Sequence, residues 1–272
     1  MKIDFMKIHG IGNDFIITNN SIAPGDYSPV AKKICNRHFG VGADGFMVVE
    51  KSEKADVKMV YYNQDGSLAK MCGNGLRCFS KYIFDKNIVK SRNFTVETLD
   101  GIKKVEITEV DVQGLAKSIK AELGWYQLDF LRKTLKINEE TLEIGSLHVG
   151  VPHVVVFEEI LSENRLRTVG PALEKHQHFS EGTNVNFARV WDRENVEVKT
   201  WERGCGYTLG CGTGMTAVVV LGNLLGKLST KVQAHSPGGS LGIDIYPEKK
   251  EITMTGPAEA ICEGVYELKF SK

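Results

Sequence analysis

The sequence predicts an α+β fold of two similar, pseudo-symmetric domains, each a curved mixed β-sheet around a central helix. Many short segments are rich in β-branched residues and bounded by Gly, Asp or Asn, as strands are. Helical segments are fewer. One pattern occurs twice: a strand, a polar turn, Cys-Gly-X-Gly, a helix, a strand, a turn containing Gly and another strand. Such a repeat indicates two copies of one α+β unit.

Two helices are predicted to begin at the repeated cysteine motifs, over residues 74–87 and 212–227, because an apolar, helix-like run follows each motif. Two more are predicted over 28–39 and 169–179. The predicted strands are the β-branched segments 57–63, 94–100, 103–108, 153–159, 183–190, 196–203, 230–236, 241–246 and 251–256.

The domain boundary is predicted near Lys120, because the sequence turns polar over residues 109–125. The N-terminal domain is then 1–119, which carries Cys72. The C-terminal domain is 120–272, which carries Cys211. Whether the last strand returns to the N-terminal domain is left open.

The composition excludes several classes of partner. Lys plus Arg and Asp plus Glu both number 34, so no basic surface for nucleic acid or an anionic membrane is expected. The sequence lacks a signal-peptide pattern and any apolar run of membrane-spanning length, which favours the cytoplasm. The six cysteines are therefore interpreted as thiols.

The two glycine-rich turns are predicted anion sites. Each enters a helix, whose first N–H groups lack intrahelical partners and lie at the positive end of the helix dipole. The turns consist of Gly73, Asn74 and Gly75 in one copy and Gly212, Thr213 and Gly214 in the other. A carboxylate held between two such turns would be bound from both sides.

The cysteines before these turns, Cys72 and Cys211, suit acid–base chemistry. A helix N-terminus lowers a thiol pKa from its usual value of about 8.5. Two thiols beside one anion cannot both ionise cheaply, so the pair keeps one proton and supplies one base and one acid. A base and an acid on opposite faces of an α-carbon invert it, and this racemisation needs no pyridoxal phosphate or other cofactor.

The other cysteines have simpler interpretations. Cys35, Cys78 and Cys262 are expected to be small buried hydrophobic residues. A zinc site built on the two C-x5-C spacings is a rival, but structural zinc pairs use shorter spacings, so no metal is expected. A disulfide between Cys72 and Cys211 would be an oxidised, inactive form.

The chain resembles the diaminopimelate epimerase family over nearly its whole length. The resemblance rests on "KIHGIGNDF", "NQDGSLAKMCGNGLRC", "VGVPHVVVF", "GTNVNFARV" and "WERGCGYTLGCGTG". It implies a pyridoxal-independent isomerase that inverts an α-carbon of diaminopimelate in a cleft between the two domains, in amino-acid and lysine biosynthesis. The implied partner is a small amino-acid substrate, and a homodimer is left open.

The resemblance also implies roles for particular residues. The implied catalytic residues are Cys72, Cys211, His153 and Glu202. The implied substrate-binding residues are Asn13, Asn63, Gly73, Asn74, Val151, Asn184, Glu202, Arg203, Gly212 and Thr213.

Several of these residues also have structural interpretations. The three asparagines at positions 13, 63 and 184 lie in turn-like contexts, where Asn is common for backbone reasons. His153 could be a hydrogen-bonded core histidine. Glu202 and Arg203 could be a solvated pair closing a strand.

Val151 departs from the family, which normally has asparagine before Pro-His, at a contact with the distal end of diaminopimelate. Valine cannot donate that hydrogen bond, and an unpaired buried carboxylate oxygen costs roughly 1–3 kcal/mol. A different amino acid, with histidine as the leading candidate, is therefore a rival substrate, although Arg203 could still pair with a distal carboxylate. Two further rivals are a non-catalytic module that binds an anion or zinc and a phenazine-type isomerase, which normally lacks the cysteine pair.

Overall fold

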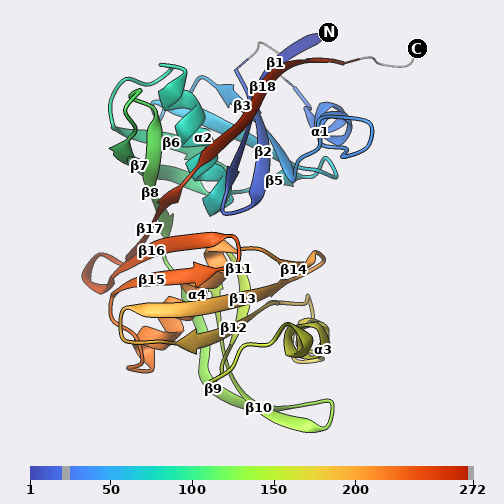
Figure 1. Cartoon of the computed structure of the whole chain (residues 1–272), viewed down its shortest axis with the longest axis vertical. Helices are drawn as coiled ribbons and strands as arrows, with labels where there is room; N and C mark the ends of the chain where they lie inside the picture. Colours follow the sequence, from blue (N-terminus) through green and yellow to red (C-terminus); the bar gives the residue numbers. More distant parts are fainter. Residues whose placement is uncertain (20–24, 269–272) are drawn as a thin grey trace. The chain divides into compact units, whose positions relative to one another are not determined.

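A computed structural model describes residues 1–19 and 25–268 of the chain and has the expected α+β composition of mixed sheet and few helices. It divides the chain into two compact units (Figure 1). Unit 1 comprises Met1–Ala121 and the segment from Gly256, and unit 2 comprises Glu122–Thr255. The first division lies next to Lys120, and the final strand belongs with unit 1.

Unit 1 contains two helices, α1 (Ser28–Ile34) and α2 (Gly73–Asp85). Its strands are β1 (Lys2–Gly10), β2 (Asn13–Thr18), β3 (Gly45–Glu50), β4 (Val57–Asn63), β5 (Leu68–Ala69), β6 (Asn93–Thr98), β7 (Gly101–Val110), β8 (Ala116–Gly124, which begins in this unit) and β18 (Glu259–Glu267). The pairs β18–β1, β1–β2, β3–β4, β4–β5, β6–β7 and β7–β8 are antiparallel, whereas β2–β3 and β4–β6 are parallel.

Unit 2 contains α3 (Glu163–Glu174), α4 (Gly212–Leu224) and a short 3₁₀ helix (Pro247–Lys249). Its strands are β9 (Gln127–Ile137), β10 (Glu140–Val149), β11 (Val151–Phe157), β12 (Asn184–Val190), β13 (Asn195–Glu202), β14 (Gly206–Thr208), β15 (Lys231–Ser236), β16 (Gly239–Tyr246) and β17 (Glu251–Pro257, which ends beyond this unit). The pairs β9–β10, β10–β11, β12–β13, β13–β14, β15–β16 and β16–β17 are antiparallel, whereas β11–β12 and β13–β15 are parallel.

The two units therefore have the same order of strands and the same pairing senses, which confirms the predicted pseudo-symmetry. The strand registers assign equivalent positions in the two copies. The equivalent pairs are Asn13 with Val151, Phe15 with His153, Met47 with Asn186, Tyr61 with Thr200 and Cys72 with Cys211. Chemical differences between these pairs show how the copies have diverged.

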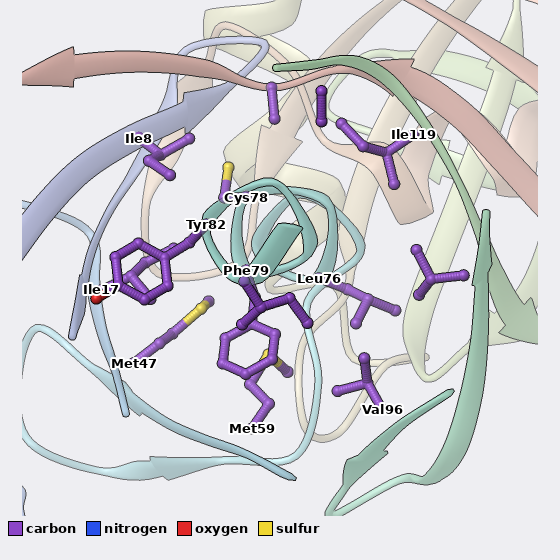
Figure 2. Packing of buried hydrophobic residues seen from close by; sticks show 14 of the residues in the cluster. Ile8, Ile17, Met47, Met59, Leu76, Cys78, Phe79, Tyr82, Val96 and Ile119 are labelled. Carbon is purple, nitrogen blue, oxygen red and sulfur yellow. The ribbon is translucent and has the colours of Figure 1, made fainter. Parts of the chain in front are cut away.

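Each unit is built around one buried helix. In unit 1 the side chains of α2 fill the core on several sides, with Leu76, Cys78 and Phe79 pointing to different surrounding strands (Figure 2). In unit 2 the interior of α4 is almost entirely buried and includes the run Val218–Val220. β-Branched residues are only moderate helix formers, so burial and not intrinsic propensity stabilises α4.

Two predicted helices have different limits in the structure. The helix predicted over 169–179 is α3, which begins at Glu163 because the hydroxyl of Ser162 caps it by accepting a 3.1 Å hydrogen bond from the Arg165 N–H. The helix predicted over 28–39 stops at Ile34. There the side chain of Asn36 accepts hydrogen bonds from the following backbone and forms a turn instead.

The polar stretch used to place the boundary is itself a strand. In β8 the residues Ala116, Ile119, Ala121 and Leu123 are buried and alternate with more exposed ones. The next two strands, β9 and β10, form a hairpin whose first strand is largely exposed. These strands were not predicted, because their exposed faces carry polar residues and the segments therefore do not read as β-branched apolar runs.

Candidate active site

Cys72 is the residue that caps the N-terminus of α2. Its backbone is extended, with φ −140° and ψ 127°, and its sulfur accepts a hydrogen bond from the Gly75 N–H at 3.5 Å. Its carbonyl accepts the first helical bond, from Leu76, at 2.7 Å. A side chain at position 75 would lie 2.4 Å from the end of Met47, so glycine is what lets the turn lie on β3.

Asn13, the first residue of β2, contacts the Cys72 sulfur. The sulfur donates to the Asn13 Oδ1 at 3.6 Å, and the Asn74 amide donates to the same oxygen at 3.4 Å. The Asn13 Nδ2 donates to the Asp44 carboxylate at 2.7 Å. Because a carboxylate only accepts, this bond fixes which end of the Asn13 amide faces Cys72. A carbonyl oxygen also only accepts, so a hydrogen bond at this contact is donated by the protonated thiol.

Asp44 belongs to a charged cluster beside Asn13. Arg37 donates to Asp14 at 2.8 Å and to Asp44 at 2.6 Å, and Lys7 lies 2.9 Å from Asp14. Burial of Asp14 opposes its ionisation, but the hydrogen bonds from Arg37 and Lys7 outweigh that effect and lower its pKa to about 2. Asn13 is thus held by Asp44, which shares the Arg37 guanidinium with Asp14.

Replacing Arg37 with methionine is expected to lower the free energy of unfolding by about 1 kcal/mol at pH 7, a modest value because Arg37 is half exposed. The depressed pKa of Asp14 gives stability that is full above the ordinary value of 3.8 and is lost as the pH falls through about 2. The difference from wild type should therefore shrink over that range in urea unfolding. Arg132→Met, which removes a 3.9 Å surface pair, is the matched control and should change nothing. A difference that stays constant down to pH 2 would contradict the assignment.

The remaining predicted residues of unit 1 divide into two groups. Gly73 and Asn74 form the first turn of α2, next to Cys72. Asn63 ends β4, where it accepts from the Tyr61 hydroxyl at 3.0 Å and donates to Ser67 at 2.9 Å. Its own hydrogen bonds do not join it to the Cys72 group.

The other cysteines correct one expectation. Cys35 and Cys78 are fully buried, and burial raises the pKa of both thiols, that of Cys35 to about 12. Cys262, expected in a core, is exposed on β18, a strand of largely exposed residues that pairs with β1. Within the described ranges, no group of three or more His, Cys, Asp or Glu side chains is placed to hold a metal ion.

Cys211 occupies the equivalent cap of α4. It has an extended backbone, with φ −109° and ψ 107°, and its carbonyl accepts from the Met215 N–H at 2.9 Å. Its sulfur lies 3.5 Å from the Thr213 hydroxyl. A side chain at Gly214 would lie 2.2 Å from the Asn186 Oδ1, so this helix start packs directly on β12. Gly212 and Thr213 form the first helical residues, as expected.

His153 lies on β11 and is fully buried. Its Nδ1 is 3.3 Å from the Asn186 Nδ2, which also donates to the Val154 carbonyl at 3.0 Å. Thr200 donates to the Asn186 Oδ1 at 3.0 Å. Burial lowers the pKa of His153 to about 3, so the ring is neutral. Its Nε2 has no hydrogen-bond partner among the described residues, so the ring is buried but only half satisfied.

Asn184 and Arg203 are joined through the backbone. The Asn184 side chain donates to the Pro152 carbonyl at 3.1 Å and accepts from the Arg203 N–H at 3.0 Å. The Arg203 guanidinium donates to the Glu181 carbonyl at 2.9 Å and is otherwise exposed. Asn184 therefore links the ends of three segments and is not merely a turn residue.

Glu202 and Val151 lie at the ends of neighbouring elements. Glu202 ends β13, is half buried, and accepts from the Thr208 hydroxyl at 2.6 Å. Val151 begins β11 directly after Gly150, whose φ of 71° is easily adopted only by glycine. The Val151 side chain is 37% exposed, a notable value for an aliphatic residue on a strand.

Comparisons with known proteins agree with this architecture. The sequence profile of diaminopimelate epimerase matches residues 5–124 and 145–261. The diaminopimelate epimerase of Alkaliphilus metalliredigens is 44% identical over 98% of this chain and 98% of its own length. That of Clostridium perfringens is 42% identical over 96% and 98%. The chain belongs to the diaminopimelate epimerase family. It is therefore an isomerase, an epimerase or racemase.

Solved structures support the epimerase fold at low sequence identity. A probable proline racemase from Agrobacterium radiobacter has a TM-score of 0.77 at 13% identity, covering 99% of this chain and 93% of that one. A phenazine biosynthesis protein of the PhzF family from Bacillus anthracis has a TM-score of 0.76 at 15% identity, covering 98% and 100%. No helix in the described part of the epimerase chain is long and apolar enough to cross a membrane.

Sequence reasoning did not identify the residues that hold the predicted site residues in place. These are Asp44 and Arg37 around Asn13, Asn186 and Thr200 beside His153, and Thr208 on Glu202. Asn186 did carry a signal, since it is a buried polar residue between the apolar residues Val185 and Phe187 of its strand. The others become visible only when strand registers are known.

Proposed function

We propose that this epimerase inverts the α-carbon of an amino acid without a cofactor, using Cys72 and Cys211 as its acid–base pair. The observation that supports the proposal is that both copies of one repeated fold place a cysteine at the same position, the N-cap of the buried helix. A core cysteine would be sealed in the hydrophobic interior, as Cys78 is. A cap position instead sets each sulfur beside the first helical N–H groups, which have no partner within the helix.

The chemistry follows from that placement. The N–H groups at the two helix starts would bind the substrate carboxylate and stabilise the charge that builds on it as the α-proton leaves. One sulfur takes the proton as thiolate, and the other delivers a proton to the opposite face as thiol. The C–H bond broken and the C–H bond formed are at the same carbon, so the reaction is redox neutral.

The two cysteines have unequal surroundings, which supports a division of roles. At Cys72, a hydrogen bond to the Asn13 carbonyl oxygen is one that only the protonated thiol can donate. At Cys211, the sulfur lies 3.5 Å from the Thr213 hydroxyl, and either group can be the donor. The difference at Cys72 favours the thiol there, so we propose that Cys72 is the thiol and Cys211 the thiolate of the resting pair.

The remaining proposed roles concern binding. Residues proposed to bind the substrate are Asn13, Asn63, Gly73, Asn74, Val151, Asn184, Glu202, Arg203, Gly212 and Thr213, with His153 and Glu202 beside the reacting centre. Asn13 and Asn184 are each held by at least two hydrogen bonds, which fixes the direction in which their amides present donors and acceptors.

Diaminopimelate is the first proposed substrate, because it is the substrate named for relatives of 42–44% identity along the whole chain. The exposed Arg203 guanidinium is a suitable partner for a second carboxylate. Histidine is the second, because Val151 places an apolar side chain at the position where the family normally has asparagine. Loss of one hydrogen-bond donor for a distal carboxylate costs roughly 1–3 kcal/mol.

Incubation with L-amino acids and diaminopimelate in deuterated water tests both the chemistry and the substrate. Mass spectrometry is expected to find one deuterium at the α-carbon of the true substrate, and chiral chromatography its inverted product. Val151→Asn should raise the exchange of diaminopimelate relative to histidine by about tenfold, the equivalent of one hydrogen bond. Leu131→Asn, at an aliphatic residue of unit 2 with the same exposure as Val151, is the control.

Each outcome of this assay has a meaning. Exchange of diaminopimelate alone in the wild type would refute the inference from Val151. Exchange of histidine or another monocarboxylate alone would refute diaminopimelate. Binding of an amino acid without any isotope exchange would refute catalysis and favour a non-catalytic anion-binding module.

A further inference from the structure

His153 lies in a hydrogen-bond network that determines its protonation. The network consists of His153, Asn186, Thr200 and the Val154 carbonyl, and all three side chains are almost fully buried. The Asn186 amide is the central group. Its two ends can be told apart by what they contact, without reference to the histidine.

The Asn186 orientation follows from its other partners. The Val154 carbonyl can only accept, and it lies 3.0 Å from the Asn186 Nδ2. The Thr200 hydroxyl lies 3.0 Å from the other end of the amide, where it donates to Oδ1. The group that faces the His153 Nδ1 at 3.3 Å is therefore the amide N–H₂, which only donates. The Nδ1 must accept, so the ring proton lies on Nε2.

We propose that Asn186, oriented by Thr200, holds His153 as the neutral Nε2–H tautomer, so that His153 acts as a hydrogen-bond donor and not as an acid or base. This inference rests on the proposed α-carbon inversion and specifies one part of it. The acceptor would be an anion of the reacting centre, either the substrate carboxylate or a thiolate.

Two observations support a donor role. The Nε2 is buried and has no partner among the described residues, and an unsatisfied buried donor is expected where a ligand completes the bond. The charged state of His153 is opposed first by burial and then by electrostatic interaction with His148 and Arg203, which together lower its pKa.

The other copy of the fold has no His, Asn or Thr at the positions of this network. At the three equivalent positions unit 1 has Phe15, Met47 and Tyr61, and Phe15 and Met47 are buried carbon and sulfur side chains. The equivalent helix start of unit 1 packs on the apolar side chain of Met47, which stands at the position of Asn186. The architecture therefore accepts an apolar layer, and the buried polar network of unit 2 is an addition that serves a purpose other than packing.

Nitrogen NMR of protein labelled at its histidines tests the inference directly. Comparison with His153→Gln identifies the His153 signals. We expect the Nε2 of His153 to be protonated and its Nδ1 bare from pH 6 to pH 9. In Asn186→Asp the carboxylate replaces the donor, so the proton should move to Nδ1, or the ring should become charged. Protonation of Nδ1 in the wild type, or titration of the ring in this range, would overturn the inference.

Kinetics supply the second readout. Asn186→Asp is expected to lower kcat by about 100-fold or more, with a smaller change in KM. This is the effect expected when one oriented hydrogen-bond donor, here the His153 Nε2–H, is lost from the reacting centre. Asn223→Asp, at the other end of α4, is the matched control and should retain wild-type kinetics. Thr200→Val keeps the side-chain shape and should lower kcat less, with a second tautomer appearing in the spectrum. Wild-type kcat in Asn186→Asp with the tautomer moved would refute the donor role.

These outcomes are separable from failure of the proposed function. The tautomer of His153 is measured without substrate, so this part of the test does not depend on the proposed reaction. If the two cysteines prove dispensable while the Nε2–H tautomer is observed, the proposed chemistry fails and the network assignment survives. If Asn186→Asp does not fold, Thr200→Val carries the same test.

Discussion

Replacing either Cys72 or Cys211 with alanine is expected to reduce racemisation by about 1,000-fold or more while leaving the fold intact. Each variant removes one of the two proton carriers, and the remaining sulfur cannot serve both faces of the α-carbon. Cys72 is half-buried and Cys211 is buried, but each variant removes only one sulfur atom at a helix cap, so the fold is expected to survive. The measurements are α-deuterium incorporation and chiral analysis of the product, with circular dichroism for the fold.

The chain offers a control thiol in each unit. Cys262 of unit 1 and Cys205 of unit 2 are both exposed and belong to neither helix start, so their alanine variants should racemise at the wild-type rate. Retained racemisation in Cys72→Ala or Cys211→Ala would refute the two-thiol mechanism. The same variants test the division of roles through the pH dependence of iodoacetamide alkylation, with the alkylated cysteine identified by peptide mass spectrometry, because Cys205 and Cys262 also react. If Cys72 is alkylated at lower pH than Cys211, the assignment of thiol and thiolate is contradicted.

Gly214→Ala is expected to lower the free energy of unfolding by about 2–3 kcal/mol. The added methyl group would lie 2.2 Å from the Asn186 Oδ1, and Asn186 cannot move away without breaking its bonds to Thr200 and Val154. The start of α4 or the network must therefore shift. Urea unfolding measures the loss, and a parallel loss of activity is expected because Cys211 caps the same turn.

The pseudo-symmetric Gly75→Ala is the matched control. There the methyl group would lie 2.4 Å from the terminal methyl of Met47, a flexible side chain that can change rotamer. The expected loss is about 1 kcal/mol or less. Equal losses in the two variants would show that the hydrogen bonds of Asn186 do not hold it in place.

The repeated fold and the two helix starts could be predicted because their signals are local. Cys72 and Cys211 each precede glycines and an apolar run, and a helix N-terminus depends on only a few successive residues. The start of α3 was missed although Ser162 is a standard capping residue, since the residues after it are polar and gave no apolar period. Exposed strands such as β9 were missed for the same reason.

The network around His153 could not be predicted, because it depends on three strands. His153, Asn186 and Thr200 come from β11, β12 and β13, and they meet only because the parallel and antiparallel registers set them side by side. A shift of one residue in either register would turn Asn186 to the other face of the sheet. The sequence contains the residues but not the register that makes them neighbours.

The position of β18 has a consequence for synthesis of the protein. Unit 1 is assembled from both ends of the chain: β18 pairs with β1, Ala258 lies in the core around α2, and the Pro257 carbonyl accepts from Arg77. A ribosome delivers these residues after all of unit 2. Unit 1 is therefore translated first but can complete its fold only after unit 2 has been synthesised. Until β18 emerges from the ribosome, the core around α2 lacks the residues that this last segment supplies.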